Sequence, residues 1–147
     1  MNVLIADDDD SIRQVLALML YTLGNKYNNK DIRINEVRNG LELSSRIEPE
    51  HSYDLIITDN DMPGRKGLDV LIGLRERKDY TPAIIFTGNP LIIERLEETN
   101  KKITYGNSNA KIYSLNKPAG PRDLEEVILM AKPSFNNLPG ANQYASL

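Results

Sequence analysis

Carboxylate side chains gather at two points of the sequence where an apolar run ends. The first group follows the run that opens the chain and consists of Asp7, Asp8, Asp9 and Asp10. The second group follows the run at 55–57 and consists of Asp59 and Asp61. Carboxylates placed in this way can catalyse a reaction on a substrate, be modified themselves, or bind a cation. Mg²⁺ is the best match among cations, because it prefers oxygen ligands and keeps waters that a phosphate oxygen can replace.

A hydroxyl group and an ammonium group follow two further apolar runs. Thr87 follows the run at 83–86, in the sequence Thr-Gly-Asn, and Lys117 follows the run at 112–115, in the sequence Asn-Lys-Pro. A hydroxyl donor and a cation are the groups that stabilise the oxygens of a phosphoryl group not bound by a metal. These residue types therefore suit phosphate chemistry beside a carboxylate.

Short apolar runs alternate with stretches of helical spacing along the chain. The runs predict four strands, at 3–6, 55–57, 83–86 and 112–115, and the alternation of Ile32 and Ile34 with polar residues predicts a further strand at 31–37. Apolar residues at intervals of three and four predict helices at 11–23, about 40–47, 68–74, 91–96 and 124–130. Asp10 or Ser11 is the expected N-cap of the first helix, and Gly24 is its expected C-cap. This alternation predicts an α/β fold with a parallel sheet and helices on both faces.

The predicted topology places the polar residues together. In parallel α/β sheets, a site forms outside the carboxyl ends of the strands, and the groups described above all follow strands directly. We therefore expect carboxylates, a hydroxyl and an ammonium group to converge on one edge of the sheet. Such crowding would raise the pKa of a carboxyl group unless a cation is bound.

Four motifs at these strand ends carry a family resemblance. In chain order they are VLIADDDDSIRQ, YDLIITDNDMPGRKGLDVL, AIIFTGN and LNKP. Together they resemble the receiver domain of two-component response regulators, over roughly residues 1–131. The resemblance implies a flavodoxin-like, doubly wound, five-stranded parallel sheet with strand order 2-1-3-4-5.

The resemblance also assigns roles to individual carboxylates. It implies that Asp59 is the phosphoacceptor. It implies that Asp7 and Asp8 bind Mg²⁺ together with Asp59, and that Asp61 contributes its backbone carbonyl. The side chain of Asp61 is a separate hypothesis, since an added carboxylate near the acceptor would change the lifetime of the phosphorylated state.

The remaining roles concern two residues. The resemblance implies that the hydroxyl of Thr87 bonds the aspartyl phosphate and that Lys117 pairs with it, making Asp59, Thr87 and Lys117 the catalytic set. The Lys117-Pro118 bond is expected to be cis. The expected function is that of a stand-alone receiver, not an enzyme, which accepts a phosphoryl group from a histidine kinase or histidine phosphotransfer protein. Phosphorylation would then switch the binding of a downstream target protein.

Two alternatives fit parts of the sequence. One is a receiver-like interaction module that signals without phosphate, which the complete set of site residues disfavours. The other is a phosphatase of the haloacid-dehalogenase type, with Asp59 as nucleophile and Asp61 as general acid. That class expects Thr or Val soon after the second acid and another acidic pair late in the chain. Here Met62-Pro63-Gly64 follows, and the acidic pair comes first.

The chain also departs from the family pattern. Receivers usually have Tyr or Phe three residues before the lysine, where this chain has Ser114. Tyr113 or Tyr105 could take that role or simply pack. The extra residues at 99–111 are expected to form a hairpin or a loop. Residues 99–117 carry four lysines and no acidic residue, which suggests an acidic partner.

Composition sets the remaining expectations. The chain has 147 residues, a net charge of −3 and no cysteine, which excludes disulfides, thiolate catalysis and cysteine-ligated zinc. We expect one domain at 1–132, followed by an uncharged, flexible tail at 133–147. The apolar start ends in four acids, which fits neither a signal peptide nor a spanning helix. A cytoplasmic protein is therefore expected, a monomer or weak dimer that binds neither nucleic acid nor membrane.

Overall fold

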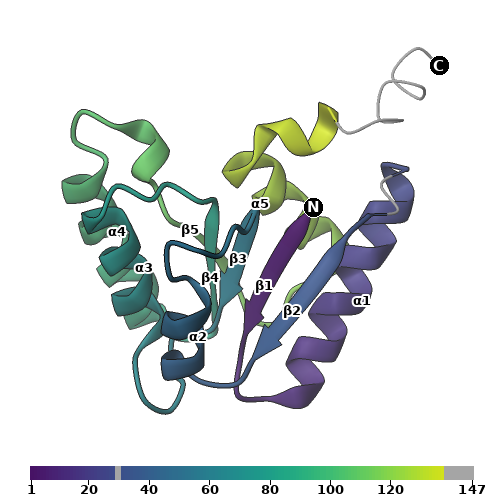
Figure 1. The fold of residues 1–147 in the computed structure, drawn as a ribbon, viewed down its shortest axis with the longest axis horizontal. Helices are drawn as coiled ribbons and strands as arrows, with labels where there is room; N and C mark the ends of the chain where they lie inside the picture. The colour runs from purple at the N-terminus through teal and green to yellow at the C-terminus, as the bar shows by residue number, and fades with distance from the viewer. Residues whose placement is uncertain (29–30, 138–147) are drawn as a thin grey trace.

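Five parallel strands form the centre of the protein in the order β2-β1-β3-β4-β5 (Figure 1). The computed structural model describes residues 1–28 and 31–137. Its strands are β1 (Asn2–Ala6), β2 (Arg33–Val37), β3 (Leu55–Thr58), β4 (Ala83–Thr87) and β5 (Tyr113–Asn116). Every neighbouring pair is parallel. The predicted fold class and strand order are therefore confirmed.

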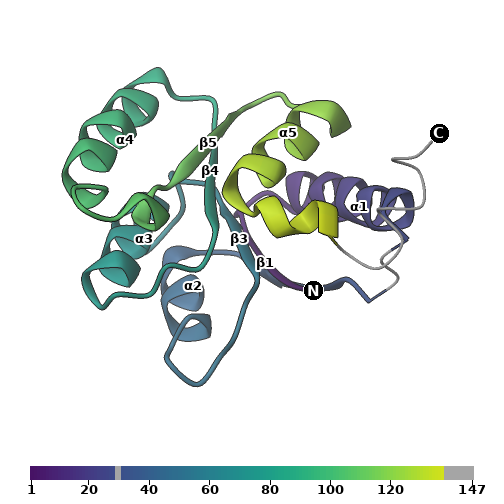
Figure 2. The ribbon, with the colours of Figure 1, turned by 90° about the horizontal axis from the view of Figure 1, so that it is seen from above.

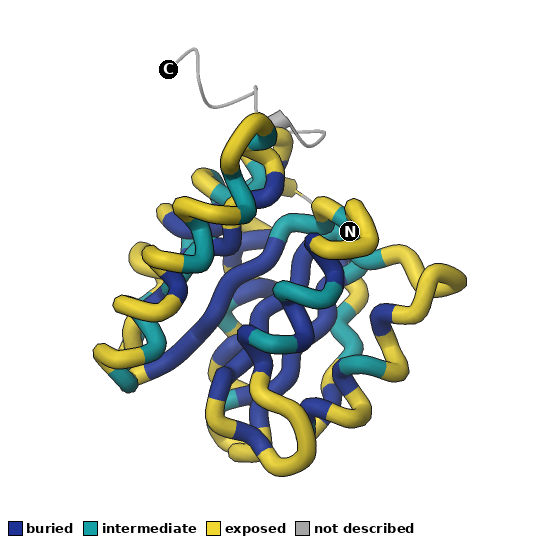
Figure 3. The backbone as a smooth tube through the Cα atoms, turned by 90° about the vertical axis from the view of Figure 1, so that its left-hand side faces the viewer, coloured by how far each residue is buried: buried dark blue, intermediate teal, exposed yellow. Residues whose placement is uncertain are grey.

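Helices cover both faces of the sheet, as Figure 2 shows from above. One face carries α1 (Asp10–Lys26) and α5 (Pro121–Ala131), and the other carries α2 (Gly40–Arg46), α3 (Gly67–Glu76) and α4 (Pro90–Ile103). All residues of β3 and β4 are buried (Figure 3). Consecutive side chains of a strand point to opposite faces, so these apolar runs need helices on both sides. No helix in the described part of the chain is long and apolar enough to cross a membrane.

The ends of α1 differ from the prediction. Its N-cap is Asp9, not Asp10 or Ser11, and the Asp9 carboxylate accepts hydrogen bonds from the backbone N–H groups of the two residues that follow Asp10. The helix also continues through Gly24 to Lys26. Its last turn is stabilised by α5, because Lys26 Nζ lies 2.6 Å from a carboxylate oxygen of Glu125. A tertiary contact thus outweighs the local C-cap signal of the glycine.

Residues 99–111 form neither of the two expected structures, a hairpin or merely a loop. Helix α4 extends to Ile103, and the chain then turns through Gly106, at φ +77°, into the 3-10 helix η1 (Ser108–Ala110). Side chains hold this segment in place. The amide of Asn100 pairs with the backbone N–H and C=O of Ile112, at 3.0 and 2.8 Å, and Arg75 Nε donates to the Ala110 carbonyl at 2.8 Å.

The packed domain continues past the expected boundary at residue 132. Residues 133–137 form the 3-10 helix η2 (Pro133–Asn137), in which Phe135 is fully buried. Its ring meets that of Tyr27 edge to face, with centroids 5.1 Å apart. The Tyr27 hydroxyl donates to Glu125, and burial together with this bond raises the pKa of Tyr27 to about 12. The expected tail, at 133–147, therefore begins five residues too early, because residues 133–137 belong to the packed domain. Residues 138–147 lie outside the described part of the chain.

We predict that Phe135→Ala lowers the free energy of unfolding by about 3–5 kcal/mol, because it removes a fully buried ring from the core. Ser134→Ala, at the exposed neighbouring position, is the matched control and should stay within about 0.5 kcal/mol of the wild type. Urea unfolding of the three proteins measures both effects. Equal stabilities of the two variants would show that η2 contributes nothing to the fold.

Candidate functional site

The carboxyl ends of the strands bring acidic side chains together at one edge of the sheet. Asp7 and Asp8 follow β1, and Asp59 follows β3, which pairs directly with β1. One carboxylate oxygen of each of these three residues lies within 4.8 Å of the other two. The convergence expected for these three carboxylates is thus observed, and it results from parallel pairing of adjacent strands.

Asp7 is the most constrained carboxylate of this cluster. It is 1% exposed, and one of its oxygens accepts a hydrogen bond from the backbone N–H of Asp9 at 2.9 Å. The other oxygen lies 2.8 Å from Lys117 Nζ. Arg13 fixes the same loop, because its buried guanidinium donates to the Asp7 backbone carbonyl at 2.7 Å and pairs with Asp10. Arg13 was not singled out from the sequence, where it is one polar residue among several in an amphipathic helix.

Asp59 is buried but less enclosed than Asp7. Its side chain is 10% exposed, and one oxygen lies 3.7 Å from Lys117 Nζ. Burial raises the pKa of Asp59 above its ordinary value. Lys117 opposes this rise, Asp7 adds to it, and the backbone of residues 60 and 61 lowers the pKa by hydrogen bonding. The net effect is a carboxyl group whose charged form is disfavoured in the folded protein.

Asn60 fixes the turn after Asp59 and was not identified from the sequence. It is 2% exposed. Its side-chain oxygen accepts a hydrogen bond from the backbone N–H of Leu68, and its backbone oxygen accepts from Gly67, both at 3.1 Å. An asparagine between two aspartates gives no sequence signal of its own, so only the folded loop identifies its function. Asn60 attaches the turn to the start of α3.

Gly67 permits this close packing. A Cβ atom at position 67 would lie 2.1 Å from the backbone oxygen of Asp59, well inside the shortest non-bonded contact that a carbon and an oxygen atom can make. The oxygen belongs to the backbone and cannot move away as a flexible side chain would. The start of α3 therefore approaches the Asp59 backbone only because residue 67 has no side chain.

We predict that Gly67→Ala lowers the free energy of unfolding by about 2 kcal/mol or more, because the backbone at Asp59 must shift. Gly73→Ala, in the same helix, is the matched control: nothing lies within 4 Å of its added Cβ. That variant should gain about 0.5–1 kcal/mol from the higher helix propensity of alanine. Chemical denaturation of both variants would contradict the packing argument if the two changes had the same sign.

Thr87 and Lys117 occupy the neighbouring strand ends. Thr87 is 1% exposed, and its hydroxyl oxygen accepts a hydrogen bond from the backbone N–H of Asn89 at 3.1 Å, which leaves the hydroxyl proton available for donation. The backbone N–H of Lys117 donates to the Thr87 carbonyl at 3.0 Å, and the Lys117-Pro118 bond is cis, as expected. The ammonium of Lys117 lies near Phe86, with Nζ 5.2 Å from the ring centroid.

The side chain of Asp61 lies outside the carboxylate cluster. It is half exposed, and one of its oxygens lies 3.6 Å from Lys66 Nζ and accepts a hydrogen bond from the Asn60 side chain at 3.2 Å. Lys66 thus partly neutralises this carboxylate.

The two candidate aromatic residues behave differently from each other. Tyr113 is half-buried in β5, with Lys111 Nζ 4.9 Å from its ring centroid. Tyr105 is 93% exposed, so the expectation that it packs is wrong. The turn after α4 points this ring into solvent.

The donor set fits Mg²⁺. Three carboxylates lie within 4.8 Å of one another, while among the described residues only the ammonium group of Lys117 forms ion pairs with two of them, Asp7 and Asp59. Oxygen ligands with excess negative charge are what a hard divalent cation requires, and a bound cation would relieve the repulsion that contributes to the raised pKa of Asp59.

We predict a pH-dependent gain in stability for Asp59→Asn without added cation. Because the pKa of Asp59 is raised on folding, the folded state binds its proton more tightly, and ionisation costs stability as the pH rises. The gain should therefore be full above the folded pKa of Asp59, shrink as the pH falls through that pKa, and vanish below the unfolded pKa. Thermal unfolding from pH 3 to 8 measures it, with Glu76→Gln, at an exposed position of α3, as control. A gain independent of pH would contradict the electrostatic argument.

Fold and site together define the class of protein. A flavodoxin-like sheet with two acidic residues after β1, one after β3 and a lysine after β5 matches the response regulator receiver domain, whose family model covers residues 3–129. The chain belongs to this family. Receiver domains are signalling domains, not classical enzymes, and they typically use Mg²⁺.

Individual relatives agree with this assignment. The chain is 34% identical over 130 residues to the transcriptional regulatory protein SrrA of Staphylococcus aureus, a match that covers 88% of this chain and 46% of SrrA. The chain thus spans less than half the length of the curated relatives it matches. Among solved structures, the receiver domain of Francisella response regulator 1452 has 26% identity and a TM-score of 0.62, over 90% of this chain and 98% of that one. A receiver domain from Clostridium thermocellum has 23% identity and a TM-score of 0.69, over 93% and 98% of the two chains, and shows the fold alone.

Proposed function

We propose that Asp59 accepts a phosphoryl group from a histidine kinase or histidine phosphotransfer protein, in a reaction that depends on Mg²⁺. The observation that carries this proposal is the position of Asp59, which shares a cluster with Asp7 and Asp8 and lies 3.7 Å from Lys117 Nζ. Membership of the receiver family supports it.

The arrangement also favours Asp59 over its neighbours as the acceptor. Asp7 is 2% exposed at its side chain, and both of its oxygens have close partners, whereas the Asp59 side chain is 10% exposed. Asp8 is exposed to solvent, where nothing enforces the orientation of a reacting group. Asp59 alone combines access with fixed surroundings.

The chemistry follows from these groups. A carboxylate oxygen of Asp59 attacks phosphorus, while the bond from phosphorus to the donor's histidine nitrogen breaks and its electron pair stays on the imidazole. The product is an acyl phosphate. Bound Mg²⁺ would be held by Asp7, Asp8, Asp59 and the backbone carbonyl of Asp61, and would supply positive charge at the transferring oxygens. Lys117 and the hydroxyl proton of Thr87, which lie at adjacent strand ends, would stabilise the remaining oxygens.

A groove beside the site supports docking of the phosphodonor. It has a volume of about 300 Å³ and lies between α1 and the segment after β5; its lining includes Ile12, Val15, Met19 and Lys117. Lys117 belongs to both the groove and the Asp59 site. A donor protein could therefore bury apolar side chains against α1 while its histidine reaches Asp59.

The phosphatase alternative receives no support from the position of Asp61. A general acid must reach the leaving group of the substrate, whereas the Asp61 carboxylate is directed toward Lys66 and Asn60.

The alternative of a phosphate-independent module is disfavoured by the complete acidic cluster with its lysine. Four further expectations stay predictions: that the receiver acts alone, that it is cytoplasmic, that it does not bind nucleic acid, and that it is a monomer or weak dimer.

Incubation with a small acyl phosphate and Mg²⁺, followed by intact mass measurement, tests the proposal. We predict that the wild type gains the mass of one phosphoryl group, that Asp59→Asn gains none, and that Asp69→Asn, a surface control on α3, behaves as the wild type. No gain in the wild type would favour the phosphate-independent module. A gain that persists in Asp59→Asn would remove Asp59 from its proposed role.

The same measurement, followed over time, tests the hypothesis on the Asp61 side chain. If its charge affects hydrolysis, Asp61→Asn should lose the phosphoryl group at a rate different from that of the wild type. Rates that are indistinguishable at several Mg²⁺ concentrations would contradict this hypothesis and leave the role of Asp59 untouched.

A further inference from the structure

A pocket of about 430 Å³ lies at the edge of the sheet opposite the carboxylate cluster. Tyr80 and Pro82 line it from the segment before β4, and further lining residues come from 108–111, directly before β5. Because all five strands are parallel, their amino ends meet at the edge opposite to the one that carries Asp59. The length of β4 separates the two edges by roughly 16 Å, at about 3.3 Å per residue. The pocket is therefore distinct from the Asp59 site.

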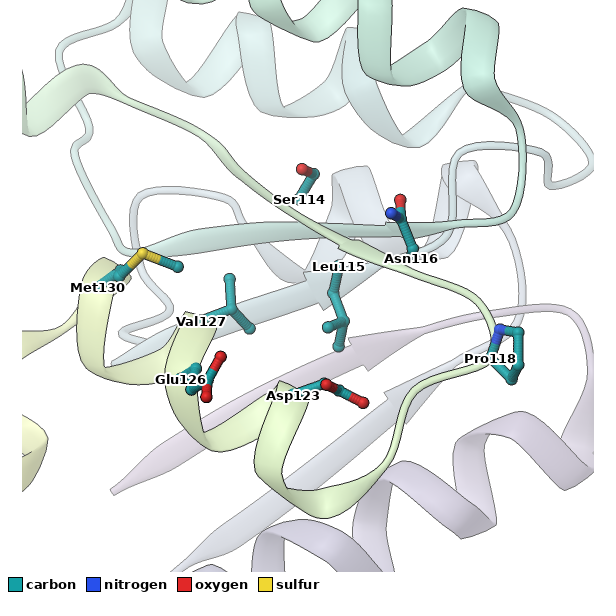
Figure 4. Close-up of a pocket in the computed structure, with 8 residues that line it drawn as sticks. All are labelled: Ser114, Leu115, Asn116, Pro118, Asp123, Glu126, Val127 and Met130. Carbon is teal, nitrogen blue, oxygen red and sulfur yellow. The ribbon is translucent and has the colours of Figure 1, made fainter.

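The pocket lies on the face of the sheet that α5 covers. Figure 4 shows the neighbouring groove, in which Ser114 lies on the opposite face of β5 from Leu115 and Val127. Consecutive residues of a strand alternate between faces, so Tyr113 lies on the same face as Leu115, and it packs against the core cluster of that face. Met130, near the end of α5 in the same view, lines the pocket together with Tyr113. An aromatic ring and a thioether thus give this wall an apolar surface.

One buried side chain fixes two walls of the pocket against each other. The guanidinium of Arg75, a residue that is 6% exposed, donates to the Ala110 carbonyl at 2.8 Å, in the wall before β5. It also donates to the carbonyls of Asp79 and Thr81, at 2.8 and 2.9 Å, in the wall before β4. Arg75 thus links the backbones of two loops. A pocket with fixed walls loses little conformational freedom when a ligand binds.

Lys111 supplies a positive charge to this pocket. The lysines of 99–117 suggested an acidic partner, but Lys101 and Lys102 lie in the last turn of α4, where they complement the helix dipole, and Lys117 pairs with the carboxylate cluster. The Lys111 side chain forms no ion pair or hydrogen bond within the described residues; its Nζ lies 4.9 Å from the ring centroid of Tyr113. It is the lysine of this segment whose charge has no counterpart in the fold.

Polar groups beside Lys111 complete a set of donors. Ser108 and Asn109 line the pocket from η1, and their side chains are exposed. No aspartate or glutamate is among the described lining residues. The acid next to Tyr80, Asp79, is used within its own turn, where its carboxylate accepts from the N–H and hydroxyl of residue 81 at 2.9 and 2.7 Å. An ammonium, a hydroxyl and an amide can therefore donate to one carboxylate or phosphate group of a ligand.

We propose that this pocket binds a small anion that carries a planar ring, with an aromatic carboxylate or a mononucleotide as the source. The anionic group would lie at Lys111 and η1, and the ring would pack against Tyr80, Pro82 and Met130. The volume of about 430 Å³ is within the range of small-molecule sites. A neutral ring would leave the charge of Lys111 unpaired, and an inorganic anion would leave the apolar lining uncovered. The proposal goes beyond phosphotransfer and does not depend on it.

Amide spectra of the labelled full chain, recorded with a panel of probes, test the proposal. Adenosine monophosphate and benzoate are the anions with a ring; adenosine, benzamide and inorganic phosphate are the controls. We expect at least one of the two anions to shift the amides of Asn109, Lys111, Tyr113 and Met130. It should bind about ten-fold or more tightly than its controls. Which of the two anions binds identifies the source.

Two pairs of variants locate the ligand. Lys111→Gln should weaken binding about ten-fold, whereas Lys102→Gln, an exposed lysine outside the pocket lining, should leave the affinity within about two-fold of the wild type. Tyr80→Leu should also weaken binding, whereas Tyr105→Leu, which removes a ring that is 93% exposed, should not. The mass gain at Asp59 should be unchanged in all four variants, so failure of this proposal is distinguishable from failure of the proposed function.

Several outcomes would overturn the proposal. These are a panel in which no probe shifts the four amides at about 10 mM, neutral analogues that bind as tightly as the anions, and equal effects within either pair of variants. Shifts of the same amides on raising the protein concentration without a probe would assign the pocket to a second copy of the chain, which also excludes the proposed ligand.

Discussion

Electrostatic repulsion between carboxylates is the constraint on which the rest of this structure depends. Parallel pairing of β1 with β3 places Asp7 and Asp59 in one poorly exposed cluster, where burial and the neighbouring Asp7 carboxylate both disfavour ionisation of Asp59. Lys117, from the end of β5, offsets part of this repulsion by approaching both. The remaining negative charge gives the site its affinity for a cation, so the same repulsion that costs stability prepares the site for a phosphoryl group and its metal.

Carboxylates that repel each other stay close only if the backbone that carries them cannot move apart. Hydrogen bonds and close packing fix the loops at this edge of the sheet. The Asp7 loop is fixed by the Asp9 amide and by the buried guanidinium of Arg13. The Asp59 loop is fixed by Asn60 and by the close approach of Gly67. None of these four residues needs to contact a phosphoryl group, yet each restricts the distance between the two carboxylates. The site is therefore a property of the loops as much as of its reactive side chains.

Much of this arrangement could be predicted from the sequence, because it depends on patterns that repeat. Apolar runs predicted four strands and an alternating pattern predicted the fifth, and the polar residues after four of these strands predicted the edge at which the site lies. What could not be predicted depends on single tertiary contacts. Glu125 stabilises the last turn of α1, Asn100 and Arg75 hold the segment after α4, and Tyr27 supplies a partner for Phe135 in a segment that otherwise resembles a tail. The partner of such a residue is distant in the chain, so local sequence gives no sign of it.

Calorimetric titration of Mg²⁺ tests the central claim most directly, namely that the strand-end carboxylates form one cation-dependent site. The account predicts one ion per chain for the wild type and an affinity about ten-fold or more weaker for Asp59→Asn. Asp9→Asn is the matched control, because it removes a negative charge from the same loop while asparagine still caps α1. Its affinity should stay close to that of the wild type. Equal affinities for wild type and Asp59→Asn, or equal losses in the two variants, would contradict the account.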